Sequence, residues 1–519
     1  MPELQTDKLF ETATETAHTE VAHINGKIPE WLRGSFIRIG PGKFDIDNFT
    51  MNHWFDGYSI MSKFSVTGDT VKFEKKYLQS DAYKRAVAAK RPVLTEFGTR
   101  AYSDPNKSLL SRIVSACLPI ELTDNDSINL FQLGSEIFAS GETCFFRKID
   151  PSSLGTEEKF DTNKCFGLNV ACAHPITDDN GVTYTLGSSV ITGLKYNIVK
   201  IPAGKGSAKD LMKKSKIIAS INSSWTGVMS YNHSFGMSKS WIIFIEQPYV
   251  MNIGKAAVSY LKGGHTFSDW LEWRGENFKN RFWLIEKETG KVLKVDFRSN
   301  EPFFFLHIIN AYEDDGQVVV DLASYRNPDS LKDMNLTKVR NGDLSQDSQA
   351  SAHRYVIPVI TELKDAPENV DLVAIKSTAS AVRQGNEIIL TPEALTLKGF
   401  EMPVINNKFV GKKHKYFYAA GNMDSSLSHT ICKCDTKKTS SSLVWRESDY
   451  YFPGEPVFIP NPNATAEDDG VIVCGVTDSR HDSSDFLLFL DAKTFKELGR
   501  VKFRQHIPLA FHGIFLPQS

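Results

Sequence analysis

The sequence predicts an all-β fold made of repeated antiparallel hairpins, for three reasons. Short runs rich in β-branched and aromatic residues dominate the 519-residue chain, and Gly, Asp and Asn turn signals separate them. Segments with one shared pattern of strand, turn and strand recur several tens of residues apart, at residues 144–160, 183–201, 282–297, 415–435 and 486–503. A β-sandwich would be complete in far fewer residues, so this repetition favours the blades of a β-propeller.

Two stretches with helical character interrupt the strands. In the first, at about residues 106–121, apolar side chains share one helix face: Leu109, Leu110, Ile113, Val114 and Cys117. The second, residues 250–273, mixes apolar residues with Lys255 and Lys262. Each stretch could dock on a membrane surface or cover the body of its own fold, and the periodicity leaves both interpretations open.

The composition limits the partners and the compartment. Sixty basic and 62 acidic side chains give a net charge of −2, which is no electrostatic footprint for nucleic acid. The seven cysteines are scattered and odd in number, and the first residues lack a basic apolar signal, so we expect free thiols in the cytoplasm. No run of 18 apolar residues predicts a transmembrane helix.

Four histidines lie in settings unlike those of the other nine: His174, His233, His307 and His512. His307 is within residues 303–309, which are apolar on both strand faces, so its imidazole is expected to be buried, and neutral imidazole is a common metal ligand. The spacings of 59, 74 and 205 residues match no short metal motif such as HExxH. They are compatible with one ligand from each of four blades, although a single buried histidine is more often a hydrogen-bonded core residue.

Three carboxylates offer a second indication. Glu142, Glu401 and Glu455 each lie within two residues of a Gly or Pro beside a strand-like segment. A metal-bound histidine usually donates its second N–H to a carboxylate, and three such acids would offset the charge of a divalent ion. Ordinary turn or surface acids would produce the same pattern, so both interpretations stay open.

Eight short motifs occur in order from about Trp31 to Gly513. They are Arg38–Gly42, Trp54–Gly57, Thr95–Thr99, Ala173–Pro175, Tyr231–Gly236, His307–Asp314, Gly454–Pro456 and Phe511–Gly513. Together they resemble the carotenoid cleavage oxygenases, whose animal branch contains carotene oxygenases, a retinal-pigment-epithelium isomerohydrolase and an insect carotenoid isomerooxygenase.

The resemblance implies one domain over residues 1–519, a seven-bladed β-propeller with a short N-terminal arm (about residues 1–25). A few helical or loop insertions would cap one face over an iron site. It implies Fe(II) bound by His174, His233, His307 and His512, with Glu142, Glu401 and Glu455 behind these ligands. It also implies an aromatic substrate cavity lined by Phe55, Phe97, Tyr231, Tyr325 and Phe511.

The activity implied is O₂-dependent cleavage of a carotenoid at its central 15,15′ double bond to retinal-type aldehydes. Coupled trans-to-cis isomerisation of one half is a variant of this activity. The alternatives are an isomerohydrolase that acts on retinyl esters without O₂, an oxygenase that cleaves off-centre, and a propeller that only binds a partner. The four histidines and three acids argue against the last.

The chain departs from the animal relatives at three places, one of which, Ile308 in place of a second His after His307, removes no ligand. Residues 103–107 read Ser-Asp-Pro-Asn-Lys where the family often has Pro-Asp-Pro-Cys-Lys, so a cysteine that could be acylated is missing. Peripheral membrane association would then depend on the amphipathic stretch that follows, and the oxygenase is mildly favoured over the isomerohydrolase. Gly141 stands where vertebrate relatives tend to have Thr, and a smaller residue would leave more room if this position faces the iron.

Overall fold

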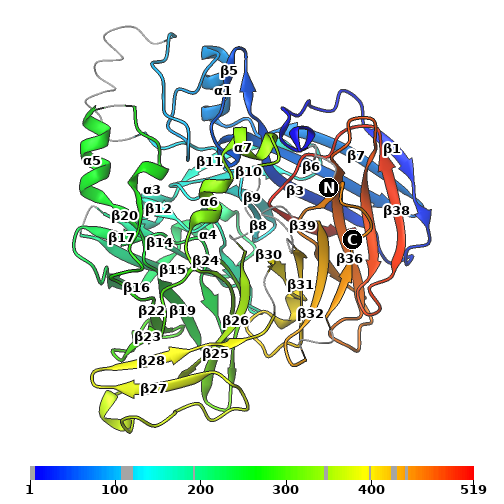
Figure 1. Cartoon of the computed structure of the whole chain (residues 1–519). Coiled ribbons are helices and arrows are strands. Elements are labelled where there is room, and N and C mark those ends of the chain that lie inside the picture. Colours follow the sequence, from blue (N-terminus) through cyan, green and yellow to red (C-terminus); the bar gives the residue numbers. More distant parts are fainter. Residues whose placement is uncertain are drawn as a thin grey trace.

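The computed structural model describes residues 6–106, 121–190, 193–262, 264–343, 349–396, 399–421, 429–438 and 442–518. Most of the predicted insertion at residues 106–121, with Leu109, Leu110 and Ile113, lies outside these ranges. The described part is strand-rich, and its sheets fan out around the middle of the molecule (Figure 1), which confirms the all-β class.

Three of the larger sheets consist mainly of strands from the N-terminal part of the chain, and the last strand, β39 (His512–Pro517), joins the first of them. The first contains β1 (Glu20–His23), β7 (Thr70–Tyr77), β6 (Tyr58–Thr67), β3 (Gly34–Lys43) and β39. The second contains β11 (Gly155–Asp161), β10 (Phe145–Asp150), β9 (Glu136–Ser140) and β8 (Asn129–Leu133). The third contains β12 (Val170–Ala171), β14 (Thr183–Ser189), β15 (Lys195–Ile201) and β16 (Lys216–Asn222), with β13 (Ile176–Thr177) beside β14.

The middle of the chain forms three more sheets. One contains β17 (Val228–Ser230), β20 (Tyr249–Asn252) and β21 (Leu271–Trp273). Another contains β18 (Gly236–Met237), β19 (Trp241–Glu246), β22 (Arg281–Glu286), β23 (Asp296–Ser299), β28 (Glu387–Thr391) and β27 (Ser380–Gln384). The third contains β24 (Phe304–Asp314), β25 (Gln317–Tyr325), β26 (Ser351–Pro358) and β29 (Glu393–Ala394).

The C-terminal part adds two sheets, and a two-stranded ribbon lies near the start of the chain. One sheet contains β30 (Phe400–Val404), β31 (Tyr416–Gly421), β32 (Thr430–Asp435) and β33 (Leu443–Trp445). The other contains β2 (Asn25–Gly26), β38 (Glu497–Phe503), β37 (Asp485–Asp491), β36 (Gly470–Asp478) and β34 (Tyr451–Pro453), with β35 (Val457–Pro460) beside β36. The ribbon pairs β4 (Asp45–Ile46) with β5 (Phe49–Thr50).

The five predicted hairpins are all antiparallel strand pairs. They are β10 with β11, β14 with β15, β22 with β23, β31 with β32, and β37 with β38. These hairpins were predictable because alternation and turn residues are local signals. The hydrophobic core lies between neighbouring sheets, as where Phe64 and Phe73 pack beside Phe503.

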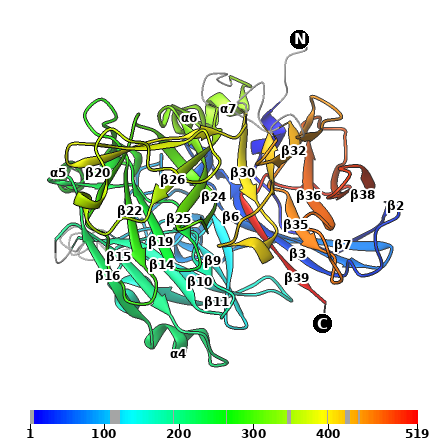
Figure 2. The ribbon, with the colours of Figure 1, turned by 90° about the horizontal axis from the view of Figure 1, so that it is seen from below.

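Short helices decorate the sheets. The α-helices are α1 (Asp81–Ala89), α3 (Thr162–Phe166), α4 (Ala208–Lys213), α5 (Ile253–Lys262), α6 (Asp329–Asp333) and α7 (Leu336–Arg340). The 3₁₀ turns are η1 (Asp7–Phe10), η2 (Trp54–Asp56), η3 (Ser268–Trp270), η4 (Leu363–Asp365) and η5 (Asn407–Phe409). In Figure 2, α5, α6 and α7 lie along one edge of the molecule and α4 lies at the opposite edge.

The predicted helical stretch at residues 250–273 is α-helical only over α5, and it adds the single 3₁₀ turn η3. Its ends form β20 and β21, which pair with each other, so the expectation of a helix is wrong there. The physical reason is burial: Val250 and Leu271 are covered by the fold, and an extended pair of strands buries both while satisfying their backbone hydrogen bonds.

Residues 6–26, most of which belong to the expected N-terminal arm, pack against the sheets. Leu9 and Phe10 are buried, and the buried Lys8 ammonium donates to the Asp478 carbonyl at 2.7 Å. Strand β1 then pairs with β7, and β2 pairs with β38. Strand β39, from the other end of the chain, lies beside β3, so segments far apart in sequence complete the same sheet.

Two further expectations concern cysteines and membrane spans. The six cysteines within the described ranges are all free thiols. None of the helices found there has the length and apolar character needed to cross a bilayer.

Candidate metal centre and aromatic cavity

The four predicted histidines converge on one point. Their nitrogen atoms all lie within 4.8 Å of one another, and they form the group of potential metal ligands found in the described part of the chain. The Nε2 of His307 is 3.1 Å from the Nε2 atoms of His233 and His512, and the Nε2 of His174 is 3.1 Å from that of His233. Imidazole nitrogens bind a divalent metal at about 2.1 Å, so two of them at right angles around one ion are about 3.0 Å apart. The observed separations fit a metal ion in the middle.

Different strands deliver these histidines. His307 is on β24 and His512 begins β39, while His174 lies between β12 and β13 and His233 between β17 and β18. The burial predicted for His307 is confirmed.

The three predicted glutamates lie behind three of the histidines. The Nδ1 of His233 donates to Glu142 at 2.5 Å, that of His307 to Glu401 at 2.5 Å, and that of His512 to Glu455 at 2.7 Å. Because Nδ1 then carries the proton, the lone pair of Nε2 faces the shared point. For His174, no carboxylate takes this position among the residues that the structure describes.

The electrostatics favour neutral imidazoles at His174 and His233. At His307, burial alone would lower the pKa, but the Glu401 carboxylate raises it above the usual range. Burial lowers the pKa of His174 well below its usual range, and the three neighbouring imidazoles lower it further. Burial also lowers the pKa of His233. Burial alone would raise the pKa of Glu401, but the bonds that it accepts, first from His307, lower its pKa below the usual range. Neutral imidazole is the protonation state that can bind a metal ion.

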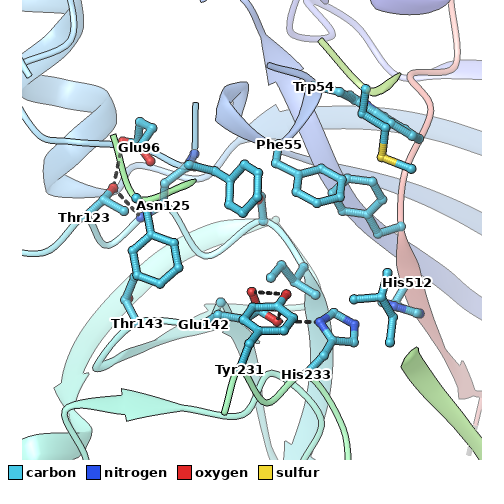
Figure 3. A pocket seen from close by; sticks show the side chains of 18 of the residues that line it. Trp54, Phe55, Glu96, Thr123, Asn125, Glu142, Thr143, Tyr231, His233 and His512 are labelled. Atoms are coloured by element: carbon cyan, nitrogen blue, oxygen red, sulfur yellow. Dashed lines mark hydrogen bonds and ion pairs between the residues drawn. The ribbon is translucent and has the colours of Figure 1, made fainter. Parts of the chain in front are cut away.

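An apolar cavity of about 190 Å³ reaches this cluster (Figure 3). Its walls include His233, His307 and His512, together with the rings of Trp54, Phe55, Phe97, Tyr231, Phe267, Trp270, Tyr325 and Phe511. All five aromatic residues predicted to line a substrate cavity are in this set. Part of the wall comes from helical turns, namely η2, η3 and, through Ser330, helix α6. Helical turns therefore cover this side of the cluster.

Comparison with known proteins identifies the family. Residues 9–517 match the family described as retinal pigment epithelial membrane protein. The chain belongs to this family, the carotenoid oxygenases. It is 38% identical to a mitochondrial carotenoid-cleaving dioxygenase of Mustela putorius furo, over 98% of this chain and 96% of that one. It is 36% identical to a β,β-carotene 15,15′-dioxygenase of Gallus gallus, over 96% of this chain and 95% of that one.

Solved structures show the same fold at low sequence identity. A cobalt-substituted Synechocystis ACO has a TM-score of 0.76 and 18% identity over the full length of both chains. An ACO/RPE65 chimera has a TM-score of 0.77 and 19% identity, over 99% of this chain and 98% of that one.

Two of the predicted tunnel residues also bind the glutamates. The Tyr231 hydroxyl donates to Glu142 at 2.7 Å, and the Tyr325 hydroxyl donates to Glu401 at 2.9 Å. Figure 3 shows Glu142 between Tyr231 and His233. The aromatic wall and the histidine cluster are therefore one connected network, which the sequence did not reveal.

Several wall residues were not predicted from the sequence. Trp54 and Glu96 belong to two of the eight motifs, so their motif positions were an available signal, whereas Trp270 and Met334 carried none. Glu96 is buried, and burial raises its pKa well above the usual range. It accepts a hydrogen bond from the Thr123 hydroxyl at 2.8 Å, and both lie far from His512 in Figure 3.

The motifs Trp54–Gly57 and Thr95–Thr99 form a single unit that holds the aromatic wall. The Asp56 carboxylate accepts bonds from the Gly98 N–H at 2.7 Å and the Thr99 hydroxyl at 2.5 Å. The His53 ring lies 4.9 Å from the Phe55 ring and 4.8 Å from the Phe97 ring. A Cβ atom at Gly98 would lie 2.7 Å from the Cβ of His53, so only glycine allows this approach.

Protonation of His53 and Asp56 is expected to change stability in opposite directions. Burial lowers the pKa of His53 from 6.5 to about 4, so between these values only the unfolded chain binds this proton. The free energy of unfolding then falls by about 3 kcal/mol as the pH drops through this window. Burial raises the pKa of Asp56 from 3.8 to about 6, so there only the folded chain binds the proton, and stability rises by a similar amount as the pH drops.

As the pH drops from 6.5 to 4, the free energy of unfolding of the His53→Gln variant should therefore rise relative to that of the unaltered chain. The free energy of unfolding of the Asp56→Asn variant should fall relative to it over the same range. Urea unfolding midpoints across this pH range measure both differences. Three parallel pH profiles would contradict the assignment of these two groups.

Gly141 does not leave the room at the metal that its size suggested. It lines the apolar cavity, but a Cβ atom there would point toward Asp126, 3.2 Å from its Oδ1. Asp126 is fully buried, and burial raises its pKa well above the usual range. The space beside Gly141 is therefore taken by the carboxyl of Asp126.

Proposed function

We propose that this chain is an iron-dependent dioxygenase that cleaves a carotenoid at its central 15,15′ double bond into retinal-type aldehydes. The observation that carries this proposal is the convergence of four histidine Nε2 atoms on a point that an aromatic cavity reaches. The substrate class is supported by relatives named as carotenoid-cleaving and β,β-carotene 15,15′-dioxygenases, which align over nearly the whole chain.

The metal would be Fe(II), held by His174, His233, His307 and His512. Bound Fe(II) supplies the activation of O₂ beside an alkene, for which open coordination positions are required. A divalent metal at this place is supported by the spacing of the nitrogen atoms and by the cobalt that a structural neighbour accepts.

The protein side chains would perform three tasks. Glu142, Glu401 and Glu455 fix the tautomer and direction of three ligand rings. The aromatic walls grip a rigid polyene and exclude water from it, because burial of its apolar surface is favourable. Phe55, Phe97, Tyr231, Tyr325 and Phe511 can also stabilise positive charge that develops along the polyene, through the negative faces of their rings.

The proposal includes a closed seven-bladed propeller in one domain over residues 1–519, with the histidines on its axis. It is supported by the repeated antiparallel sheets, by histidines from different strands that meet, and by the pairing of β39 with β3 near the start of the chain. A crystal structure with a number of blades other than seven around the histidines would contradict it.

The decisive experiment compares iron-loaded protein and a carotenoid with and without O₂. We expect the colour of the polyene to be lost only in the presence of O₂. Chromatography of the products should show that the two aldehydes have equal length. Products of unequal length would indicate off-centre cleavage, and conversion of a retinyl ester without O₂ would indicate the isomerohydrolase instead. Loss of colour without O₂ would contradict the oxygenase. The cis or trans geometry of the products tests coupled isomerisation.

We also propose that the protein is cytoplasmic and binds a membrane surface peripherally through the two predicted insertions, residues 106–121 and 250–273, the second of which contains α5. This helix exposes Val258 (51%) beside Lys255, an apolar and basic pairing that suits an anionic lipid surface. Val258→Asp is expected to lower binding to anionic liposomes in a flotation assay. Val370→Asp, at an equally exposed valine (49%) elsewhere, is the control and should leave binding unchanged. Equal binding by both variants would exclude α5 as the docking element.

A further inference from the structure

A second and larger cavity, of about 940 Å³, touches the histidine cluster. It shares only His307 and His512 with the aromatic cavity. Of the other two histidines, His174 lines only the second cavity and His233 lines only the aromatic cavity. The histidines therefore form a partition between two separate spaces.

The second cavity opens to solvent and has both polar and apolar walls. It is more polar than the aromatic cavity, so we call it the polar cavity; its polar wall residues include Asn129, Asp178, Asn180, Ser238, Asn310 and Glu455. Asp179, Asn407 and Lys412, which also line it, are exposed and mark its mouth. A hydrated divalent cation finds hydrogen-bonding partners for its water molecules along the polar side chains of these walls. The mostly apolar walls of the aromatic cavity offer few such partners, so the cation would lose hydration there, which is strongly unfavourable for a charge.

Two of the three lysines that line this cavity form ion pairs with aspartates, and the third, Lys239, is exposed. Lys287 Nζ lies 3.2 Å from Asp178 Oδ2, and Lys412 Nζ lies 2.7 Å from Asp179 Oδ2. Without the two carboxylates, the lysines would repel an approaching cation. The two aspartates are thus placed to keep the entrance passable for a dication.

His174 differs from the other three ligands in how its imidazole ring is held. The rings of His233, His307 and His512 are each held by a glutamate at Nδ1, whereas no carboxylate among the described residues holds His174. The Nε2 of His174 lies 3.1 Å from the Nε2 of His233, as two ligands of one metal ion would. The ligand that lines only the polar cavity is therefore the one whose ring can turn without breaking a hydrogen bond to a carboxylate.

We propose that the polar cavity is the path by which the divalent metal enters and leaves the site, with the His174 ring as its gate. The inference rests on the proposed function only in taking the four histidines to be a metal site. A dedicated path lets the metal exchange while an apolar ligand fills the aromatic cavity.

Cobalt(II) uptake by the metal-free protein tests this path, because the visible absorption of cobalt reports its binding without any turnover. Asp178→Asn combined with Asp179→Asn is expected to slow uptake about tenfold at low ionic strength, and added salt should remove the difference. Lys412→Glu should accelerate uptake. Asp482→Asn removes an exposed acid elsewhere and is the control.

Cobalt affinity at equilibrium should stay the same in all these variants, because none of the changed residues contacts the cluster. A carotenoid bound anaerobically in the aromatic cavity should leave the uptake rate unchanged. Uptake that is blocked by the carotenoid, or that is insensitive to the charges at the mouth, would overturn the proposal. Normal cobalt uptake in a protein that cleaves no carotenoid would instead refute the proposed function and leave the path standing.

Discussion

Replacing His307 by alanine is expected to abolish metal retention. His307 is central to the cluster, since its Nε2 lies 3.1 Å from the Nε2 atoms of both His233 and His512. Its removal also leaves the partly buried Glu401 carboxylate without one of its three hydrogen-bond donors. A site with three ligands should lose its metal on desalting, which elemental analysis of the desalted protein measures.

A partly buried histidine outside the cluster provides the control. His506 Nδ1 donates to Asp485 at 2.8 Å, so it has the same kind of carboxylate partner without the metal site. His506→Ala should lower the unfolding temperature and retain the metal. Stoichiometric metal in the His307→Ala protein would show that the ligand assignment is wrong.

Replacing Glu401 by glutamine is expected to impair metal binding more than folding. The carboxylate accepts three bonds, from His307 Nδ1 at 2.5 Å, the Met402 N–H at 2.6 Å and the Tyr325 hydroxyl at 2.9 Å. A glutamine oxygen can still accept from His307, but without a charge it orients the ring less firmly and makes Nε2 less basic. Loss of such a partner typically costs about 10- to 100-fold in metal affinity or activity.

The stability cost of this change should be small, about 1 kcal/mol, because the amide fits the same space and the Tyr325 hydroxyl can turn to accept from it. Metal titration and urea unfolding separate the two effects. Asp485→Asn, beside His506, is the matched control and should reduce stability while leaving metal affinity intact. If Glu401→Gln reduced stability and metal affinity in equal proportion, Glu401 would be a merely structural acid.

Local features of the sequence predicted much of the fold. The hairpins were readable because alternation and turn chemistry act over a few residues. The burial of His307 followed from the apolar run around it. The helix expected over residues 250–273 was wrong at both ends, because pairing between β20 and β21 depends on a contact across the stretch that its periodicity does not encode.

The site was predictable only in part for the same reason. Each histidine meets its glutamate across a long sequence separation, 91 residues for Glu142 and His233 and 94 for His307 and Glu401. No periodicity specifies such pairs, so family motifs had to supply them. The polar cavity could not be foreseen, because its walls combine single side chains from many separate segments between Asn129 and Gly513.

The pairing of β39 with β3 has a consequence for the order of biosynthesis. His512 lies in register with Ile39, so the strand that completes the first sheet also delivers the fourth histidine. The ribosome makes β39 after every other strand described, and until it docks the cluster has only three histidines. Tight metal binding can therefore begin only when the last strand is in place, and retained metal marks the molecules that have finished folding.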